Sequence, residues 1–352
     1  MTAAVHLVGS IALPRVPEVF KMVGAVLGHA ARRIPDGEPG GRRCWISWQY
    51  PLLRASTYLE PAEGAEMRAS AGFPKLRLKK GLTREELSFG ELGYAREARP
   101  SYEDFLRARE RGEIDAQARF QVCLPTPFAV VVAFCAPDAV ADIEPAYEQA
   151  MLREVEEICA AIPHNDLCLQ WDVCVEMVIW DGQIKYHGMF EANEGAMLAR
   201  LKRISAVVPE TVELGYHLCY GDWEAKHFVE PIDAGRMVAL ANALSEAMPR
   251  KIAYIHMPVP IARTDDAFFA PFDGLRLKNG IELYLGLVNA DGIDGTMKRA
   301  RAALKHLSGF GIAAECGLGR CKTADDVKAL LATHAAAAEK VSALTGDAAQ
   351  GG

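Results

Sequence analysis

The sequence has no long apolar segment and no basic region of domain size, and each absence excludes a class of protein. No stretch of its 352 residues approaches the roughly 20 continuous apolar residues of a membrane helix, so we expect no contact with a membrane. The net charge of −7 argues against nucleic-acid binding, which depends on clustered Lys and Arg. The N-terminus lacks a basic stretch followed by a long apolar one, so we expect a cytoplasmic protein without a secretory signal.

Two further patterns are missing. The turn after the first predicted strand, residues 10–14, contains no glycine-rich phosphate loop, which disfavours a dinucleotide-binding Rossmann fold. The nine cysteines are an odd number in a chain with no signal, which indicates a reducing compartment and unpaired thiols rather than a disulfide framework.

What is present is an alternation of short apolar runs and amphipathic segments over a chain that is half hydrophobic. Eight strands alternating with helices favour parallel pairing and right-handed crossovers, and therefore an α/β fold of the (β/α)8 TIM-barrel type. We expect one catalytic domain over residues 1–345. The predicted strands are 5–10, 33–38, 120–124, 167–173, 212–219, 252–257, 282–288 and 312–317, and the predicted helices are 16–30, 139–161, 197–207, 234–247, 296–307 and 324–344.

One region departs from the alternation. Residues 50–119, after the second strand, are polar and irregular, and we interpret them as an insertion that forms a lid over one mouth of the barrel or a homodimer contact. The basic run 75–80 within it predicts a solvated surface strand; the alternative is a contact for an anionic substrate. The Ala/Gly-rich tail, residues 346–352, is expected to be disordered.

Polar residues stand at the ends of the predicted strands, where a TIM barrel carries its active site. Ser10, Glu38, Asp172 and His256 follow apolar runs in this way. A carboxylate such as Asp172 at the end of a buried strand is costly unless it has a partner or a function.

Three further residues at predicted strand ends could bind a metal ion. His217 and Cys219 are two residues apart, so on a strand they point to the same side, and Cys316 ends the last predicted strand. One nitrogen and two thiolate ligands would form a catalytic zinc site with an open fourth position. The alternative is that the cysteines are core residues and His217 a hydrogen-bonded strand-end residue. We interpret the other cysteines as core or incidental thiols, with Cys321 as a competing ligand: Cys44, Cys123, Cys135, Cys159, Cys168, Cys174 and Cys321.

The residues around these positions resemble a known family. Gly-Tyr-His-Leu-Cys-Tyr-Gly around His217 and Glu-Cys-Gly-Leu-Gly-Arg around Cys316 resemble the zinc motifs of cobalamin-independent methionine synthase, in the C-terminal catalytic barrel of that family. This barrel belongs to the uroporphyrinogen decarboxylase/methionine synthase-like superfamily. Three further segments resemble family motifs in the same order along the chain: Val8-Gly9-Ser10, Asp36-Gly37-Glu38-Pro39 and Leu169-Gln170-Trp171-Asp172.

The resemblance implies roles for individual residues. Zinc would bind His217, Cys219 and Cys316, while the amino-acid part of homocysteine would bind the side chains of Ser10, Glu38 and Asp172. The family's fourth ligand is a glutamate, and His256 stands in its place; we expect His256 to be a ligand, with an acid/base role or a substrate contact as alternatives.

Two other departures bear on the substrate. The proline that follows the family's strand-four motif is absent, since Asp172 is followed by Val173 and Cys174. The family's second, N-terminal barrel, which helps to bind methyl-folate, is also absent from this sequence, which leaves the product open.

The implied activity is transfer of a methyl or larger alkyl group to a small-molecule thiol. Zinc would deprotonate the thiol, and the carbon would come from a folate, a methyl-corrinoid, an aryl methyl ether or an epoxide. The tryptophans near strand ends would suit an aromatic substrate or pack at the rim; these are Trp45, Trp48, Trp171 and Trp223. Asp172, His256 and Asp222 are the candidate catalytic residues. Asp222, Glu224 or His227 would protonate a leaving group, or would be ordinary loop residues.

Three alternatives remain open from the sequence. The first is a metal-free lyase like uroporphyrinogen decarboxylase, which would need an arginine-rich cleft, whereas the strand ends offer only Arg33 and Arg320. The second is an aryl-ether demethylase with folate or a thiol as acceptor. The third is a corrinoid-binding module without activity of its own, which the retained ligands and polar strand ends disfavour.

Overall fold

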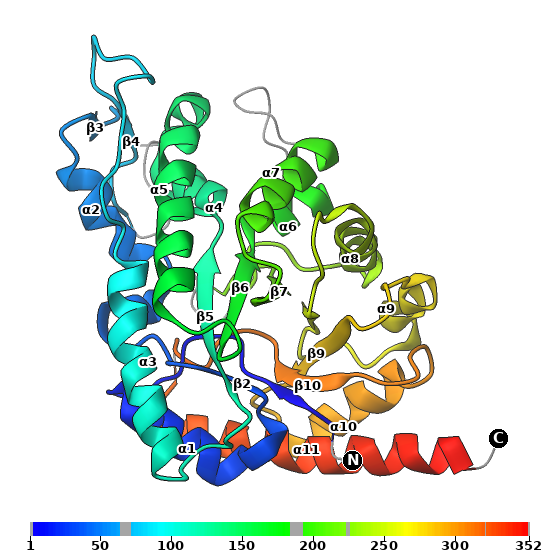
Figure 1. The fold of residues 1–352 in the computed structure, drawn as a ribbon. Helices are drawn as coiled ribbons and strands as arrows, with labels where there is room; N and C mark the ends of the chain where they lie inside the picture. Colours follow the sequence, from blue (N-terminus) through cyan, green and yellow to red (C-terminus); the bar gives the residue numbers. More distant parts are fainter. Residues whose placement is uncertain (1–2, 64–71, 184–192, 223–225, 321, 351–352) are drawn as a thin grey trace.

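The structure, a computed structural model, describes residues 3–63, 72–183, 193–222, 226–320 and 322–350. Eight parallel strands form a barrel (Figure 1), hydrogen-bonded in the order β1, β10, β9, β8, β7, β6, β5, β2. A bridge between Val5 and Ala31 brings the two ends of this sheet together, so the predicted α/β TIM barrel is confirmed. The barrel strands are β1 (Val5–His6), β2 (Arg33–Pro35), β5 (Arg119–Pro125), β6 (Leu167–Val173), β7 (Glu213–Leu218), β8 (Tyr254–Pro258), β9 (Glu282–Val288) and β10 (Gly311–Ala314).

Each of the eight strands lies where the sequence predicts one, but three are shorter than expected. β1, β2 and β10 end three or four residues before the predicted ends at Ser10, Glu38 and Gly317. Beyond them the three segments stay together through single contacts, including the hydrogen bond from Ile11 N–H to Gly37 O at 2.8 Å. The polar residues of these segments therefore lie on short loops that the barrel holds in place.

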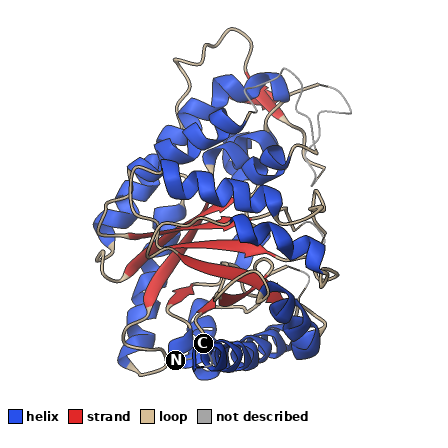
Figure 2. Cartoon of the chain, turned by 90° about the vertical axis from the view of Figure 1, so that its right-hand side faces the viewer, coloured by secondary structure: helices blue, strands red, loops and turns tan. Residues whose placement is uncertain are grey.

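Helices surround the strands on the outside of the barrel (Figure 2). All six predicted helices are present within a few residues of their expected bounds, and α11 continues to Gln350, so residues 346–350 of the expected tail are helical. The helices are α1 (Val16–Leu27), α2 (Tyr50–Ala55), α3 (Tyr94–Glu110), α4 (Pro127–Phe134), α5 (Val140–Ala161), α6 (Val175–Asp181), α7 (Glu194–Ala206), α8 (Gly235–Ala247), α9 (Asp266–Phe269), α10 (Gly292–Ala303) and α11 (Ala324–Gln350). No helix in the described ranges combines the length and the apolar character needed to cross a bilayer.

The predicted insertion is shorter than residues 50–119. Helix α3 packs against α1 and α5, so it is the regular barrel helix between β2 and β5, and the inserted part lies between about residues 40 and 93. Among its described residues are two 3₁₀ turns, α2 and an antiparallel pair, β3 (Leu59–Pro61) with β4 (Leu76–Leu78). The sequence of α3 is largely charged and its apolar residues form only one narrow buried stripe. The sequence pattern therefore did not identify it as a barrel helix.

The amino end of the barrel is closed by a network of charged side chains. Arg33 is buried and donates to Glu213 Oε2 at 2.6 Å and to Glu282 Oε2 at 2.8 Å. These three residues stand at the starts of β2, β7 and β9. Because they fill this end, the carboxyl ends of the strands form the accessible mouth.

Candidate metal centre and pocket

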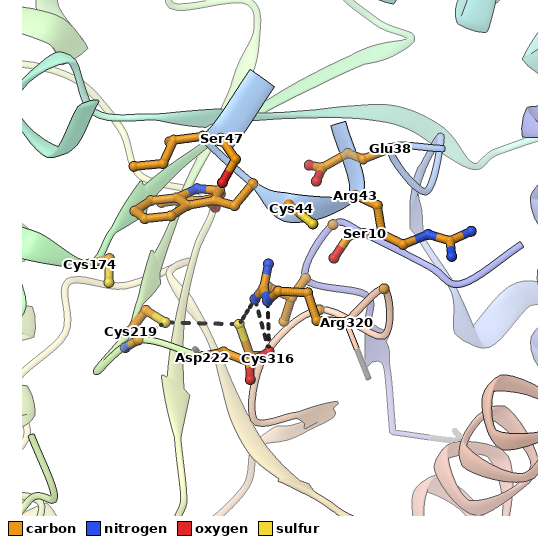
Figure 3. Close-up of a pocket in the computed structure, with 18 of the residues that line it drawn as sticks. Ser10, Glu38, Arg43, Cys44, Ser47, Cys174, Cys219, Asp222, Cys316 and Arg320 are labelled. Carbon is orange, nitrogen blue, oxygen red and sulfur yellow. Dashed lines mark hydrogen bonds and ion pairs between the residues drawn. The ribbon is translucent and has the colours of Figure 1, made fainter. Parts of the chain in front are cut away.

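A pocket of about 910 Å³ opens at the carboxyl ends of the strands (Figure 3). Its wall combines residues from loops far apart in sequence, because each strand of the barrel ends at the same rim. Of the predicted site residues, the pocket is lined by Ser10, Glu38, Asp172, His217, Cys219, Asp222 and Cys316.

Three of these side chains form a compact cluster. The Cys316 sulfur lies 3.9 Å from the Cys219 sulfur and 3.8 Å from His217 Nε2. All three donor atoms lie within 4.8 Å of one another. Zinc bonds of about 2.0–2.3 Å at tetrahedral angles separate ligand atoms by roughly 3.5–3.8 Å, so the three donors already stand close to the spacing that a zinc ion requires.

His217 is oriented by a second histidine. His256 Nε2 lies 3.1 Å from the carbonyl oxygen of Ala314, which can only accept a hydrogen bond, so this nitrogen carries the proton. Burial lowers the pKa of His256 to about 3, and its Nδ1 is therefore an acceptor. His217 Nδ1, at 2.7 Å, then donates to it, which leaves Nε2 of His217 with a free lone pair beside Cys316.

His256 is consequently not among the donors of the cluster, although the sequence predicts it as a fourth ligand. Both of its ring nitrogens are engaged, one by His217 and the other by a backbone carbonyl. Its side chain lies on the neighbouring strand in register with His217, which explains why the two rings meet.

The two clustered thiols need a cation to ionise. The interaction with the Cys174 sulfur, together with burial, raises the pKa of Cys219 well above its ordinary value. The hydrogen bond with Cys219, together with burial, does the same for Cys316. Arg320, whose Nη2 lies 3.1 Å from the Cys316 sulfur, opposes this rise. A thiol pair that stays protonated by itself and stands beside an imidazole lone pair is chemically matched to a soft divalent metal.

The pocket is also lined by two carboxyl groups with raised pKa values. Removal from water, with Asp172 and Asp36 nearby, raises the pKa of Glu38 to about 8. Burial raises the pKa of Asp172 to about 7, although Gln170 and Trp45 donate to its two oxygens at 2.8 and 3.1 Å. Two acids in this state favour a positively charged ligand between them, because a cation would stabilise both ionised forms.

Backbone conformation fixes the place of Ser10 and Glu38. A Cβ atom added at Gly317 would lie 2.3 Å from the Ser10 hydroxyl, so only glycine lets the last barrel loop approach this serine. Glu38 has a φ of +50°, a backbone angle that residues other than glycine rarely adopt. Strain of this kind is retained where the surrounding structure fixes a functional group.

Trp171 does not reach the pocket. It lies between Gln170 and Asp172 on β6, and because side chains alternate along a strand, its ring points outward into the hydrophobic core. The predicted contact of Trp171 with substrate is therefore wrong. Trp45, from the inserted segment, lines the pocket instead. Trp223, Glu224 and Cys321 lie outside the described residues.

Asp222 and His227 are both engaged by other charges. Arg320 Nη2 lies 2.9 Å from Asp222 Oδ2, so this carboxylate orients the arginine that contacts Cys316. His227 Nε2 lies 2.8 Å from Glu315 Oε1. Burial lowers the pKa of His227, but the hydrogen bond and charge of Glu315 outweigh it and raise the pKa to about 9.

Sequence reasoning did not assign Arg320 and Cys174 to the site, and it named Trp45 only as one of four tryptophans that would suit an aromatic substrate or pack at the rim. Arg320 was visible as one of few arginines near a strand end, and Cys174 as the residue in place of the family's proline. No sequence signal connects Trp45 with Asp172, because 126 residues stand between them.

The fold and this site together define a TIM-barrel protein with a His/Cys/Cys cluster at the open mouth of the barrel. No protein-family model matches the sequence, and no curated protein sequence does.

Solved structures do match it. A B12-independent methionine synthase from Shewanella sp. W3-18-1, in complex with selenomethionine, superimposes with a TM-score of 0.58 at 14% identity, covering 98% of this chain and 99% of that chain. A putative vitamin-B12 independent methionine synthase from Listeria monocytogenes gives 0.54 at 13% identity, covering 99% of each chain. At these identities the likeness establishes the barrel fold of methionine synthase-like proteins.

Proposed function

We propose that this protein is a zinc-dependent transferase that moves a methyl or larger alkyl group from a small-molecule donor to a thiol. The observation that carries the proposal is the cluster of His217, Cys219 and Cys316, which faces a large pocket and has donor spacing suited to zinc. Zinc held there would lower the pKa of a substrate thiol, so that a thiolate is available at neutral pH.

His256, in this proposal, is a positioning residue. It holds the His217 ring so that Nε2 faces the cluster, as partners of metal-binding histidines commonly do. Arg320 has a related task, because it donates to the Cys316 sulfur and is itself held by Asp222. Asp222 is then a poor proton donor, and we assign it this orienting role rather than the predicted role of leaving-group acid.

Ser10, Glu38 and Asp172 would bind the amino-acid part of the thiol substrate. The raised pKa values of the two acids support this assignment, since an ammonium group between them would stabilise both carboxylates. Homocysteine has the required ammonium and thiol. The presence of selenomethionine in the structure of the Shewanella protein agrees with an amino acid of this type.

The alkyl donor would occupy the apolar side of the pocket. This side includes residues of helices α4 and α6, and Trp45 and Phe228 also line the pocket. The substrate sulfur attacks the alkyl carbon, the bond from that carbon to the donor's heteroatom breaks, and the heteroatom keeps the electron pair and takes up a proton. An aromatic donor, such as a folate or an aryl methyl ether, suits this wall better than a small polar one.

The same pocket also has basic side chains in its lining. Arg43, Lys75 and Lys322 line it, and burial lowers the pKa of Lys75. They would attract a donor with acidic groups. A lyase could use these basic residues, but it would have no use for the cluster of His217, Cys219 and Cys316, so we rank it second. An aryl-ether demethylase would be a form of the proposed transferase.

Metal analysis of the purified protein tests the proposal. We expect about one zinc per chain in the wild type and loss of most of it in Cys219→Ser and Cys316→Ser, because each substitution removes one of three anchoring ligands. Cys159→Ser, on the outer helix α5, is the matched control and should keep its zinc. A wild-type protein that is active without any metal would contradict the proposal.

A further inference from the structure

A third cysteine lies beside the metal-type cluster. Cys174 follows directly after β6, and the hydrogen bond from Cys219 N–H to Val173 O, at 3.0 Å, aligns the ends of β6 and β7. Since Val173 pairs with Leu218 in the parallel ladder, the next residues, Cys174 and Cys219, stand side by side. Both line the pocket, and Figure 3 shows the Cys174 side chain close to that of Cys219.

We propose that Cys174 is the fourth zinc ligand when no substrate is bound, and that the substrate thiol replaces it. The centre would then have three cysteines and one histidine. This inference rests on the proposed function, because it requires zinc at the cluster.

The other nearby candidates for a fourth ligand are already engaged. His256 uses both ring nitrogens, and the carboxylate of Asp222 accepts from Arg320. Glu315 is paired with His227. Among the described residues this leaves Cys174 as a soft donor at the edge of the cluster, next to one of its three members.

A rotation of the Cys174 side chain can bring its sulfur to the cluster. Cys174 is not one of the three residues whose donor atoms all lie within 4.8 Å of one another, so binding requires its sulfur to turn toward Cys316. Neighbouring strands lie about 4.8 Å apart, and two sulfurs on one zinc ion are separated by roughly 3.8 Å. Two cysteines that stand side by side on such strands can therefore bind the same ion.

The same contacts make Cys174 the most easily exchanged of the four. His217 is held by His256, Cys219 accepts from Gly221 N–H at 3.3 Å, and Cys316 accepts from Arg320. The Cys174 sulfur interacts with Cys219, and among the described residues no N–H group donates to it. When a substrate thiol displaces it, the incoming thiol gives up its proton and Cys174 takes one up. The number of thiolates on zinc then stays at three, and no separate base is needed.

Cobalt substitution counts the thiolates directly. The full-length protein is loaded with Co²⁺ in place of zinc, and the sulfur-to-cobalt charge-transfer absorption is recorded; its intensity follows the number of Co–S bonds. We expect three such bonds in the wild type and two in Cys174→Ala, so the absorption falls to roughly two thirds. X-ray absorption at the zinc edge should likewise find three sulfur neighbours in the wild type and two in the variant.

The exchange has its own test, with homocysteine as the probe. Homocysteine added to the cobalt protein should leave three Co–S bonds in the wild type and raise the number from two to three in Cys174→Ala. Cys159→Ser should behave as the wild type in every measurement. A rise to four Co–S bonds in the wild type would overturn the exchange.

A wild-type centre with only two sulfur neighbours overturns the proposal outright, and this result needs no variant to fold. A wild-type protein that binds no metal at the cluster overturns the proposed function as well, so the two failures are distinguishable.

Discussion

His217 has two ring nitrogens, and only one of them can serve a metal at this site. The hydrogen bond to His256 uses Nδ1, and the chain of hydrogen bonds ends on a fixed acceptor, the carbonyl oxygen of Ala314. The carbonyl thereby determines the tautomer of both rings. A single residue on β8 thus sets which atom of a residue on β7 is free, without facing the pocket itself.

Removing His256 should weaken metal binding without abolishing it. In His256→Ala we expect the zinc dissociation constant to rise by about 10–100-fold, because the His217 ring loses its orientation while all three donors remain. Competition with a chromophoric chelator measures this constant. His334→Ala, at another fully buried histidine, is the control and should lose stability but not zinc affinity. An unchanged zinc affinity in His256→Ala would refute the positioning role.

At the scale of elements, the inserted segment depends on one side chain of a barrel helix. Glu154, buried on α5, accepts hydrogen bonds from the backbone N–H groups of Leu92, Gly93 and Ala95, at 2.5, 3.1 and 2.6 Å. These groups form the start of α3, where a helix leaves its first N–H groups without partners in the helix. The glutamate thereby fixes the point at which the insertion, with Trp45 in it, rejoins the barrel.

Glu154→Gln tests this junction. An amide cannot accept from all three N–H groups, so one donor stays unpaired, and we expect the free energy of unfolding to fall by about 2–4 kcal/mol. Glu157→Gln, on the same helix, loses only an exposed ion pair with Arg99 and should change stability by less than about 1 kcal/mol. Urea denaturation of both variants measures the difference. Equal effects in the two variants would show that Glu154 does not anchor the insertion.

At the scale of the whole molecule, closure of the barrel creates an electrostatic cost. Glu38 follows β2 and Asp172 lies near the end of β6, and the fold brings both carboxyl groups to the same pocket. Burial is the main cause of the raised pKa of each group, and the charge of Asp172 raises the pKa of Glu38 further.

The stability of the protein should record this cost as a function of pH. Because the pKa of Glu38 rises from 4.5 to about 8 on folding, the folded state keeps a proton that the unfolded state has lost at pH values between these two. Stability then falls as the pH rises through this window. Relative to wild type, Glu38→Gln should gain stability toward pH 8, by up to a few kcal/mol at about 1.4 kcal/mol per unit. Thermal melts from pH 5 to 9 measure this gain; parallel curves for the two proteins would contradict it.

Much of the molecule follows from local sequence pattern. The eight strands and six helices appear where apolar runs and amphipathic periods predict them, since each period matches one kind of element. The pairing of His217 with Cys219 follows from alternation along one strand. Helix α3 is the exception: its composition resembles that of an exposed segment, and only its packing on α1 and α5 identifies it as part of the barrel.

For the residues of the site, sequence and tertiary structure determine different features. The sequence by itself determined the barrel, the rim on which its polar residues stand, and three residues with the chemistry to bind zinc, because these depend on residue type and on spacing along single strands. Only the tertiary structure decided that His256 lies behind His217, that Trp171 points into the core while Trp45 reaches Asp172, and that Cys174 stands beside Cys219. Each of these contacts joins different strands or loops, and register between strands is a property of the closed barrel that no local pattern contains.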